Sequence, residues 1–242
     1  MSQKFLASVL RASVFFCALY TIHGEASVVV NGTRVVYPGG EKEVTVKVSN
    51  AGKNPVLIQT WVDDGSVNDK PEKIHVPFIL TPPIGRVDPD KSQTLRLSYT
   101  ASPALPEDRE SVYWLNVLEI PPVTKNMAPN RLQIAFRTRI KLFYRPESLV
   151  DKNQAVEAAE HLKWTSTGGK LTAINDSPYF VSLVSVTIKH GGKKNVIDGD
   201  TIPPKGSREF AVKGNISLQA GTPVSYEYIN DWGAVKAVDS HL

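Results

Sequence analysis

Short runs in which apolar and polar residues alternate recur along this chain, and they constrain its fold more than any other feature. Residues 43–48 and 94–99 each place apolar side chains at every second position. Because successive side chains of a strand point to opposite faces, this period predicts strands with one buried face. Turn-forming segments separate the runs: Pro38-Gly39-Gly40, Asp64-Gly65-Ser66, Thr81-Pro82-Pro83 and Pro121-Pro122. Such spacing is typical of an all-β sandwich.

The alternating pattern breaks near Tyr144-Arg145-Pro146 and resumes at Leu162. The polar stretch between them includes Gln154–His161, which favours one turn of helix or a loop. Each part of the chain has close to the roughly 100 residues of a sandwich domain. We therefore expect an all-β protein with two sandwich domains, at 27–146 and 150–242.

The beginning of the chain has the organisation of a secretory signal peptide. Two basic residues, Lys4 and Arg11, precede the apolar run 12–22, and small residues follow it up to Ala26. The apolar run is shorter than the roughly 20 residues of a membrane span. We expect residues 1–26 to be removed after export, and an uncleaved N-terminal anchor is the alternative.

Composition and motifs give no support for nucleic-acid, cofactor or metal chemistry. The formal charge is only +4, whereas nucleic-acid-binding proteins usually concentrate more positive charge on one face. The single cysteine, Cys17, lies in the predicted signal peptide, and the later histidines lack zinc-ligand spacing. No phosphate loop, dinucleotide-binding turn or Gly-x-Ser-x-Gly motif occurs. We expect no cofactor, no nucleic-acid partner and no membrane insertion, and a hydrolase would need a site assembled from scattered loops.

The most informative segment is 132–146, which is long for a single strand. Apolar residues alternate in its first half and basic residues in its second: Leu132, Ile134 and Phe136, then Arg137, Arg139 and Lys141. One interpretation is a core strand whose apolar positions face inward and whose basic positions face water. The other is a strand that extends past its own sheet, so that another chain can add to its free edge. The pattern alone leaves both interpretations open.

Residues 105–122, with the sequence LPEDRESVYWLNVLEIPP, resemble the signature of the periplasmic pilus (fimbrial) assembly chaperones along their whole length. Shorter segments are also similar to the family: 32–37, 81–83, 140–146, 175–179 and 228–233. The resemblance implies two immunoglobulin-like β-sandwich domains in a boomerang arrangement, and no enzymatic activity.

The resemblance also implies a function in the periplasm. Members of the family bind pilin subunits, whose own sandwich lacks its last strand, and lend them an edge strand. They then deliver the subunit to the outer-membrane usher without ATP. The expected partners are pilin subunits and the usher, with self-association of the client-free protein through its exposed apolar row. The alternative is a structural or adhesive immunoglobulin-like protein, such as a pilin or a surface binding module.

The resemblance assigns roles to individual residues of the informative segment and of the N-terminal region. Leu132, Ile134 and Phe136 are the expected donated side chains, each worth roughly 1.5–3 kcal/mol when buried. Arg34 and Lys141 are the expected anchor for the subunit's C-terminal carboxylate, since a buried carboxylate needs cationic donors. Strict alternation places Lys141 on the opposite face from the donated row. Either the strand twists or bulges between them, or anchor and row use different sides.

A further group matches the family's charge network between the two domains. It comprises Glu110, Arg145 and Asp231, and it is expected to set the angle between the sandwiches. The alternative is three solvated charges worth about 0–1 kcal/mol per pair. The stretch Pro121–Asn130 is short and free of cysteine, which indicates the branch of the family that serves rod-type pili.

Overall fold

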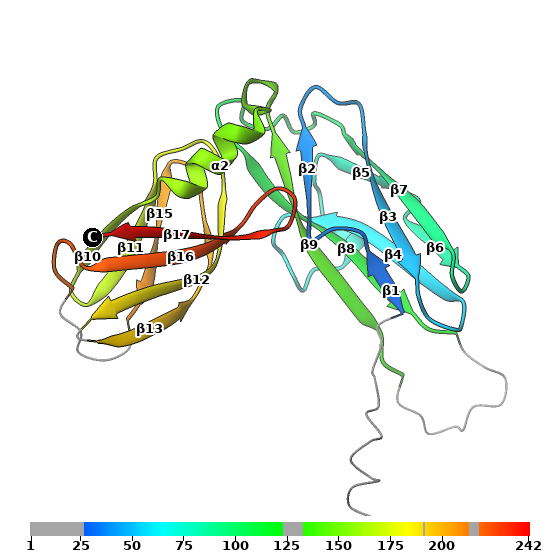
Figure 1. Ribbon diagram of the computed structural model, residues 1–242. Helices are drawn as coiled ribbons and strands as arrows, with labels where there is room; N and C mark the ends of the chain where they lie inside the picture. The colour runs from blue at the N-terminus through cyan, green and yellow to red at the C-terminus, as the bar shows by residue number, and fades with distance from the viewer. Residues whose placement is uncertain (1–26, 123–132, 191, 213–217) are drawn as a thin grey trace, which may run out of the picture.

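The computed structural model describes residues 27–122, 133–190, 192–212 and 218–242. The predicted signal peptide, 1–26, and Leu132 lie outside these residues. The chain folds into two lobes that meet at an angle, one built from its first part and one from its last (Figure 1). Each lobe contains two β-sheets, so the predicted all-β architecture of two sandwiches in a bent arrangement is confirmed.

The first lobe packs a four-stranded sheet against a five-stranded one. The smaller sheet has the order β1 (Val28–Val30), β3 (Val44–Asn50), β7 (Ser92–Tyr99) and β5 (Phe78–Thr81). The larger sheet has the order β2 (Arg34–Pro38), β9 (Phe136–Arg145), β8 (Ser111–Ile120), β4 (Val56–Asp63) and β6 (Ile84–Val87). Strands β2 and β9 are parallel, whereas the other paired strands of the lobe are antiparallel. A short 3₁₀ helix, Pro71–Lys73, lies in the connection between β4 and β5.

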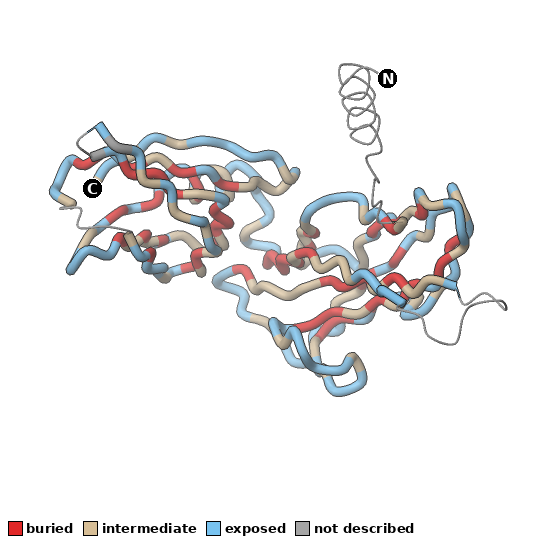
Figure 2. The backbone as a smooth tube through the Cα atoms, turned by 90° about the horizontal axis from the view of Figure 1, so that it is seen from below, coloured by how far each residue is buried: buried red, intermediate tan, exposed pale blue. Residues whose placement is uncertain are grey.

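The second lobe packs a three-stranded sheet against a larger one. The smaller sheet has the order β10 (Lys163–Thr167), β11 (Lys170–Asn175) and β15 (Gly206–Ala211). The larger sheet has the order β13 (Lys193–Asp198), β12 (Val181–His190), β16 (Pro223–Ile229) and β17 (Val235–His241), and β14 (Thr201–Ile202) also pairs with β12. Each lobe has its own apolar core, and Figure 2 shows the buried residues gathered in two separate groups.

The alternating runs of the sequence become neighbouring strands of one sheet, and their apolar sides form part of the first core. Strands β3 and β7 pair with Val46 opposite Leu95, and Leu95 and Leu97 have no exposed surface. Across the sandwich, Leu115 of β8 and Leu142 of β9 are also fully buried. The period of two therefore predicted both the strands and the faces that they bury.

The connection between the lobes differs from the expected turn or loop. A 3₁₀ helix, Glu147–Leu149, is followed by α2 (Lys152–Glu160), a helix of nine residues. Asp151 caps its first turn, because its side chain accepts a hydrogen bond from the backbone N–H of Asn153. At its other end, the Tyr226 hydroxyl donates to the carbonyl oxygen of Ala159 at 2.9 Å. This contact comes from a strand 67 positions away, so local sequence could not predict the length of the helix.

Candidate functional site

Strand β9 has an edge that is only partly covered. It pairs with β8 over its length, from Phe136 opposite Glu119 to Tyr144 opposite Ser111. On its other side, β2 pairs only with the last five residues, Lys141–Arg145. Among the described residues, the backbone of 136–140 therefore has no neighbour on that side. Such an edge presents unpaired N–H and C=O groups on which another strand can add.

Large apolar side chains stand at the beginning of this edge. Ile134 and Phe136 are 57% and 54% exposed, whereas Ile140 and Leu142 further along are 9% and 0% exposed. The predicted donated residues at 134 and 136 thus lie outside the core of their own lobe. The third, Leu132, lies outside the described residues. Exposed apolar groups beside an open edge are the combination from which a second chain gains both hydrogen bonds and buried surface.

The register of β9 is continuous. Its pairing with β8 advances residue by residue from Phe136 to Tyr144 without a bulge. Lys141 therefore lies on the opposite face of the strand from Phe136, because side chains alternate. Of the two explanations that alternation left open, a bulge between them is wrong. The two residues use different sides of β9.

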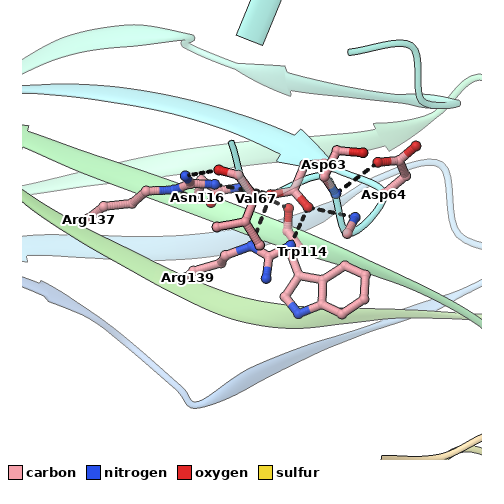
Figure 3. A network of polar contacts seen from close by, with 9 residues as sticks. Asp63, Asp64, Val67, Trp114, Asn116, Arg137 and Arg139 are labelled. Carbon is pink, nitrogen blue, oxygen red and sulfur yellow. Dashed lines mark hydrogen bonds and ion pairs between the residues drawn. The ribbon is translucent and has the colours of Figure 1, made fainter. Parts of the chain in front are cut away.

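The simplest interpretation of the alternation predicted that the basic residues of β9 face water. In the structure they do not. The guanidinium groups of Arg137 and Arg139 both bind the carboxylate of Asp63, at the end of β4 (Figure 3). Asp63 has no exposed side-chain surface, and it also accepts from Asn116 Nδ2 at 2.8 Å and Gly65 N at 2.7 Å.

Two tryptophans cover the same guanidinium groups. The Cζ atom of Arg137 lies 4.9 Å from the centroid of the Trp61 ring, and that of Arg139 lies 4.5 Å from the centroid of the Trp114 ring. These rings come from β4 and β8, so the side chains of three strands meet on the outer face of the sheet. We call this group the Asp63 network. It holds β9 where β2 no longer supports it.

Replacement of Asp63 by asparagine is expected to lower the free energy of unfolding by about 1–3 kcal/mol at pH 7, because buried donors lose a charged acceptor. Burial alone raises the pKa of Asp63, but hydrogen bonds from Arg139, Asn116 and Gly65 bring it below the ordinary 3.8. The stabilisation is therefore present above pH 3.8 and is lost as the pH falls through the lowered pKa of the folded state.

Urea unfolding of the wild type and of Asp63→Asn at pH 7 and at several values below 4 measures this loss. Asp88→Asn is the matched control, because Asp88 pairs with Arg86 on the surface and is 56% exposed. Its effect is expected to stay within about 0–1 kcal/mol. A difference between wild type and Asp63→Asn that does not shrink in acid contradicts the assignment of the charge.

Arg34 and Lys141 lie side by side where the two lobes meet. They are partners in the register of β2 and β9. Arg34 Nη1 donates to the carbonyl oxygen of Ile229 at 2.9 Å, and its buried Nε has no hydrogen-bond partner among the residues that the structure describes. Lys141 Nζ donates to the hydroxyls of Ser182 and Thr201 in the second lobe. Both predicted anchor residues therefore reach across to the other lobe.

Burial disfavours the charge of both cations. Burial lowers the pKa of Lys141, and the neighbouring Arg34 lowers it further. Burial also lowers the pKa of Arg34, against the attraction of Asp231 and Glu110. In the part of the chain that the structure describes, neither cation has a carboxylate within ion-pair distance. A pair of half-buried like charges with spare donors is suited to bind an anion such as a carboxylate.

The predicted charge network lies beside this pair, at the junction of the lobes. Arg145 Nε donates to Glu110 at 2.7 Å, and its terminal nitrogens donate to Asp231 at 2.8 and 3.1 Å. The Arg145 and Glu110 side chains are only 3% and 1% exposed, so these are not solvated surface charges. Burial raises the pKa of Glu110, although Arg145 and the N–H of Phe180 favour its charged form. The network thus joins both domains through one guanidinium group.

The described residues hold no group of three or more His, Cys, Asp or Glu side chains placed to bind a metal ion. Within the same residues, no helix is long and apolar enough to cross a membrane.

Comparison with known proteins identifies the family of this arrangement. The family described as "Pili and flagellar-assembly chaperone, PapD N-terminal domain" matches residues 27–150, and "Pili assembly chaperone PapD, C-terminal domain" matches 157–240. The chain belongs to the pili assembly chaperone family. Its members are chaperones and not enzymes, and the predicted resemblance is confirmed.

Individual pili assembly chaperones are similar along almost the whole chain. The probable fimbrial chaperone YadV of Escherichia coli K12 is 42% identical over 224 residues, which cover 90% of each chain. The chaperone protein MrkB of Klebsiella pneumoniae is 38% identical over 234 residues, with 94% of this chain and 97% of MrkB covered.

Solved structures of pili assembly chaperones share the fold. The crystal structure of the YadV chaperone matches with a TM-score of 0.76 and 40% identity, over 90% of this chain and all of the other. The SafB chaperone of Salmonella enterica, solved in complex with the SafA pilin, matches with a TM-score of 0.75 and 27% identity, over 90% and 97% of the two chains.

Some residues of this site had no individual signal in the sequence. Trp61 and Asp63 lie in a strand that the sequence analysis did not single out, and Trp114 and Asn116 lie in the family-like segment 105–122. Nothing local indicates that these four residues surround the arginines of β9. Ser182 and Thr201 were likewise not predicted, since they come from the other domain. A search for acids on neighbouring strands of the same face could have found Asp63.

Proposed function

We propose that this chain is a periplasmic chaperone that binds pilin subunits by adding the edge of β9 to their incomplete sandwich, and then delivers them to the outer-membrane usher. One observation carries the proposal: within the described ranges no strand pairs with the outer edge of residues 136–140, and the exposed side chains of Ile134 and Phe136 stand at its beginning. Membership of the chaperone family and the similarity to SafB, which was solved with a pilin, support it.

The edge supplies two kinds of interaction to an incoming strand. Its unpaired backbone groups provide hydrogen bonds whose geometry is already set, because β8 and the Asp63 network hold β9 extended. Each large apolar side chain that becomes buried adds roughly 1.5–3 kcal/mol. Ordering of the subunit opposes part of this gain. Because the edge is already formed, the entropy that the chaperone itself loses on binding is small.

Arg34 and Lys141 are proposed to hold the C-terminal carboxylate of the subunit. They lie at the point where the free edge of β9 ends and β2 begins, so a strand added to 136–140 would direct one of its ends toward them. Their charges are half-buried and have no carboxylate partner among the described residues, which supports an anion as the missing ligand. Fixing one end of the strand also fixes its register.

The charge network is proposed to keep the two lobes at the angle that forms the cleft. Arg145 is hydrogen-bonded to Glu110 in the first lobe and Asp231 in the second. The backbone N–H of Phe180 donates to the other oxygen of Glu110 at 2.7 Å, which adds a second connection. Because Ser182 and Thr201 orient Lys141 from the second lobe, a change of this angle would also displace the anchor.

The experiment that tests the proposal replaces the two exposed residues together. Ile134→Ser with Phe136→Ser is expected to weaken binding of a co-expressed pilin at least about 100-fold, because two buried apolar groups are lost. The free protein is expected to keep its stability within about 0.5 kcal/mol, since both side chains are exposed. Co-purification and titration calorimetry measure binding, and urea unfolding measures stability.

Val196→Ser is the matched control, because Val196 is 56% exposed but lies in the second lobe. It is expected to leave pilin binding unchanged. Equal recovery of pilin with the double variant and with the control would refute strand addition at β9.

A further inference from the structure

Glu119 is a buried acid that the proposed function does not use. It lies one residue before the end of β8, directly opposite Phe136 in the pairing of β8 with β9. Its residue is 8% exposed, and its two oxygens accept hydrogen bonds from the Ser27 hydroxyl and from Val28 N, the latter at 3.1 Å. Within the described part of the chain, no Lys, Arg or His nitrogen forms an ion pair with it.

A buried carboxylate without a cation is unusual. Removing a charge from water is costly, so buried charges are nearly always paired with an opposite charge. Two neutral donors, a hydroxyl and an amide, satisfy the hydrogen-bonding capacity of Glu119 only in part. A single positive charge placed beside Glu119 would therefore be stabilised.

Ser27, whose hydroxyl binds this acid, is held more firmly than is usual for a residue at the start of a domain. The carbonyl oxygen of Ser27 accepts from Ala51 N at 2.7 Å, and a side chain at Gly52 would approach Ser27 Cβ to 2.5 Å. The next residue, Val28, pairs with Asn50 in the sheet. The first residues of a domain usually fray unless they are tied down. Here three contacts hold Ser27: the hydrogen bond of its hydroxyl, the hydrogen bond of its carbonyl oxygen, and the sheet pairing of the adjacent Val28.

The predicted signal-peptide cut falls directly before Ser27. Cleavage converts the backbone amide nitrogen of Ser27 into an ammonium group. That nitrogen is separated by three bonds from its own hydroxyl oxygen, and so lies at most about 4 Å from it. Because the hydroxyl is hydrogen-bonded to Glu119, the new cation would lie within the range of about 6 Å over which opposite charges favour ionisation.

We propose that Glu119 is the receptor for the N-terminal ammonium group that processing creates. The ion pair then joins β1, the edge strand of the smaller sheet, to β8 in the larger sheet. The contact lies opposite Phe136, at the beginning of the free edge of β9. Removal of the leader thus adds an opposite charge to the existing contact between the two sheets, beside the strand that is proposed to bind clients. A chain that keeps its leader has an uncharged amide at this place.

The first test compares two forms of the exported chain, one that begins at Ser27 and one that begins at Ala26. Acylation of the α-amine at pH 7, followed by mass spectrometry, is expected to be several-fold slower in the Ser27 form, because pairing keeps the amine protonated. Glu119→Gln is expected to abolish this difference. Glu43→Gln is the control, since Glu43 is paired with Arg96 on the surface of the same lobe, and it is expected to change nothing.

The second test separates the charge from the hydrogen bonds of Glu119. Glu119→Gln is expected to lower the free energy of unfolding more in the Ser27 form than in the Ala26 form, whereas loss of hydrogen bonds alone would affect both equally. The proposal is overturned by equal amine reactivity in the two wild-type forms, or by exported protein whose first residue is not Ser27. None of these measurements uses a pilin, so their outcome is independent of the proposed function.

Discussion

Replacement of Lys141 by methionine is expected to abolish recovery of a pilin complex and, at the same time, to make the free protein more stable. Truncating one member of a buried charge contact typically weakens binding by 2–5 kcal/mol, which corresponds to a loss of affinity of at least about 30-fold. Methionine keeps the length of the side chain but removes its charge, so the loss can be assigned to the anchor.

The gain in stability follows from the titration of Lys141. Burial and the nearby Arg34 lower its pKa in the folded protein below the 10.5 of an ordinary lysine. The unfolded chain, with the ordinary lysine pKa, binds the proton more tightly than the folded protein does. The charged lysine therefore destabilises the fold at neutral pH. Stability therefore rises as the pH increases through the lowered pKa. Removal of the charge acts in the same direction at pH 7, and loss of the hydrogen bonds to Ser182 and Thr201 offsets part of the gain.

Pilin co-purification and urea unfolding measure the two effects. Lys47→Met is the control, because Lys47 lies on the exposed side of β3 and is expected to change neither. Arg34→Met is expected to abolish binding as well, but with some loss of stability, since Arg34 also donates to Ile229. Undiminished recovery of pilin with both variants would show that the subunit is held elsewhere.

Replacement of Arg145 by methionine is expected to lower the free energy of unfolding by about 3–5 kcal/mol, the usual result of leaving one member of a buried ion pair alone. Glu110 would remain almost fully buried with only the N–H of Phe180 as a strong donor. Contact between the lobes through Asp231 would also be lost.

Urea unfolding checks the stability, and small-angle scattering checks the angle between the lobes. Arg96→Met is the matched control, because the pair of Arg96 with Glu43 is bidentate but lies on the surface. Its effect is expected to be about 0–1 kcal/mol. If Arg145→Met and Arg96→Met destabilise equally, the buried pair has no special energetic role.

The fold could be predicted from sequence where local pattern and burial agree. Residues 94–99 alternate, and they form most of β7, with Leu95 and Leu97 fully buried. Alternation also separated the two faces of β9 correctly, since its pairing has no bulge. It could not show what covers each face. The arginines at 137 and 139 were expected in water because Trp61, Trp114 and Asp63 belong to strands far away in sequence.

Contacts between distant segments set the remaining limits. Ser27 and Glu119 are separated by 92 positions, and although Glu119 lies in the family-like segment 105–122, no sequence pattern paired it with Ser27. The free edge of β9 beside Ile134 and Phe136 likewise depends on where β2 begins, which no local pattern records. The resemblance to a chaperone family gave the expected roles of Ile134 and Phe136, which alternation alone left open, but it did not indicate the contact between Ser27 and Glu119.

The short reach of β2 has a consequence for the length of any strand that joins β9. Strand β2 occupies the same edge of β9 from Lys141 onward, so an incoming strand cannot advance past Arg34 without colliding with it. In the proposed binding mode the client strand therefore ends there, with its terminal carboxylate as the last group. Under the proposed function, residues appended to the C-terminus of a client would be rejected by steric obstruction, even where all apolar contacts remain available.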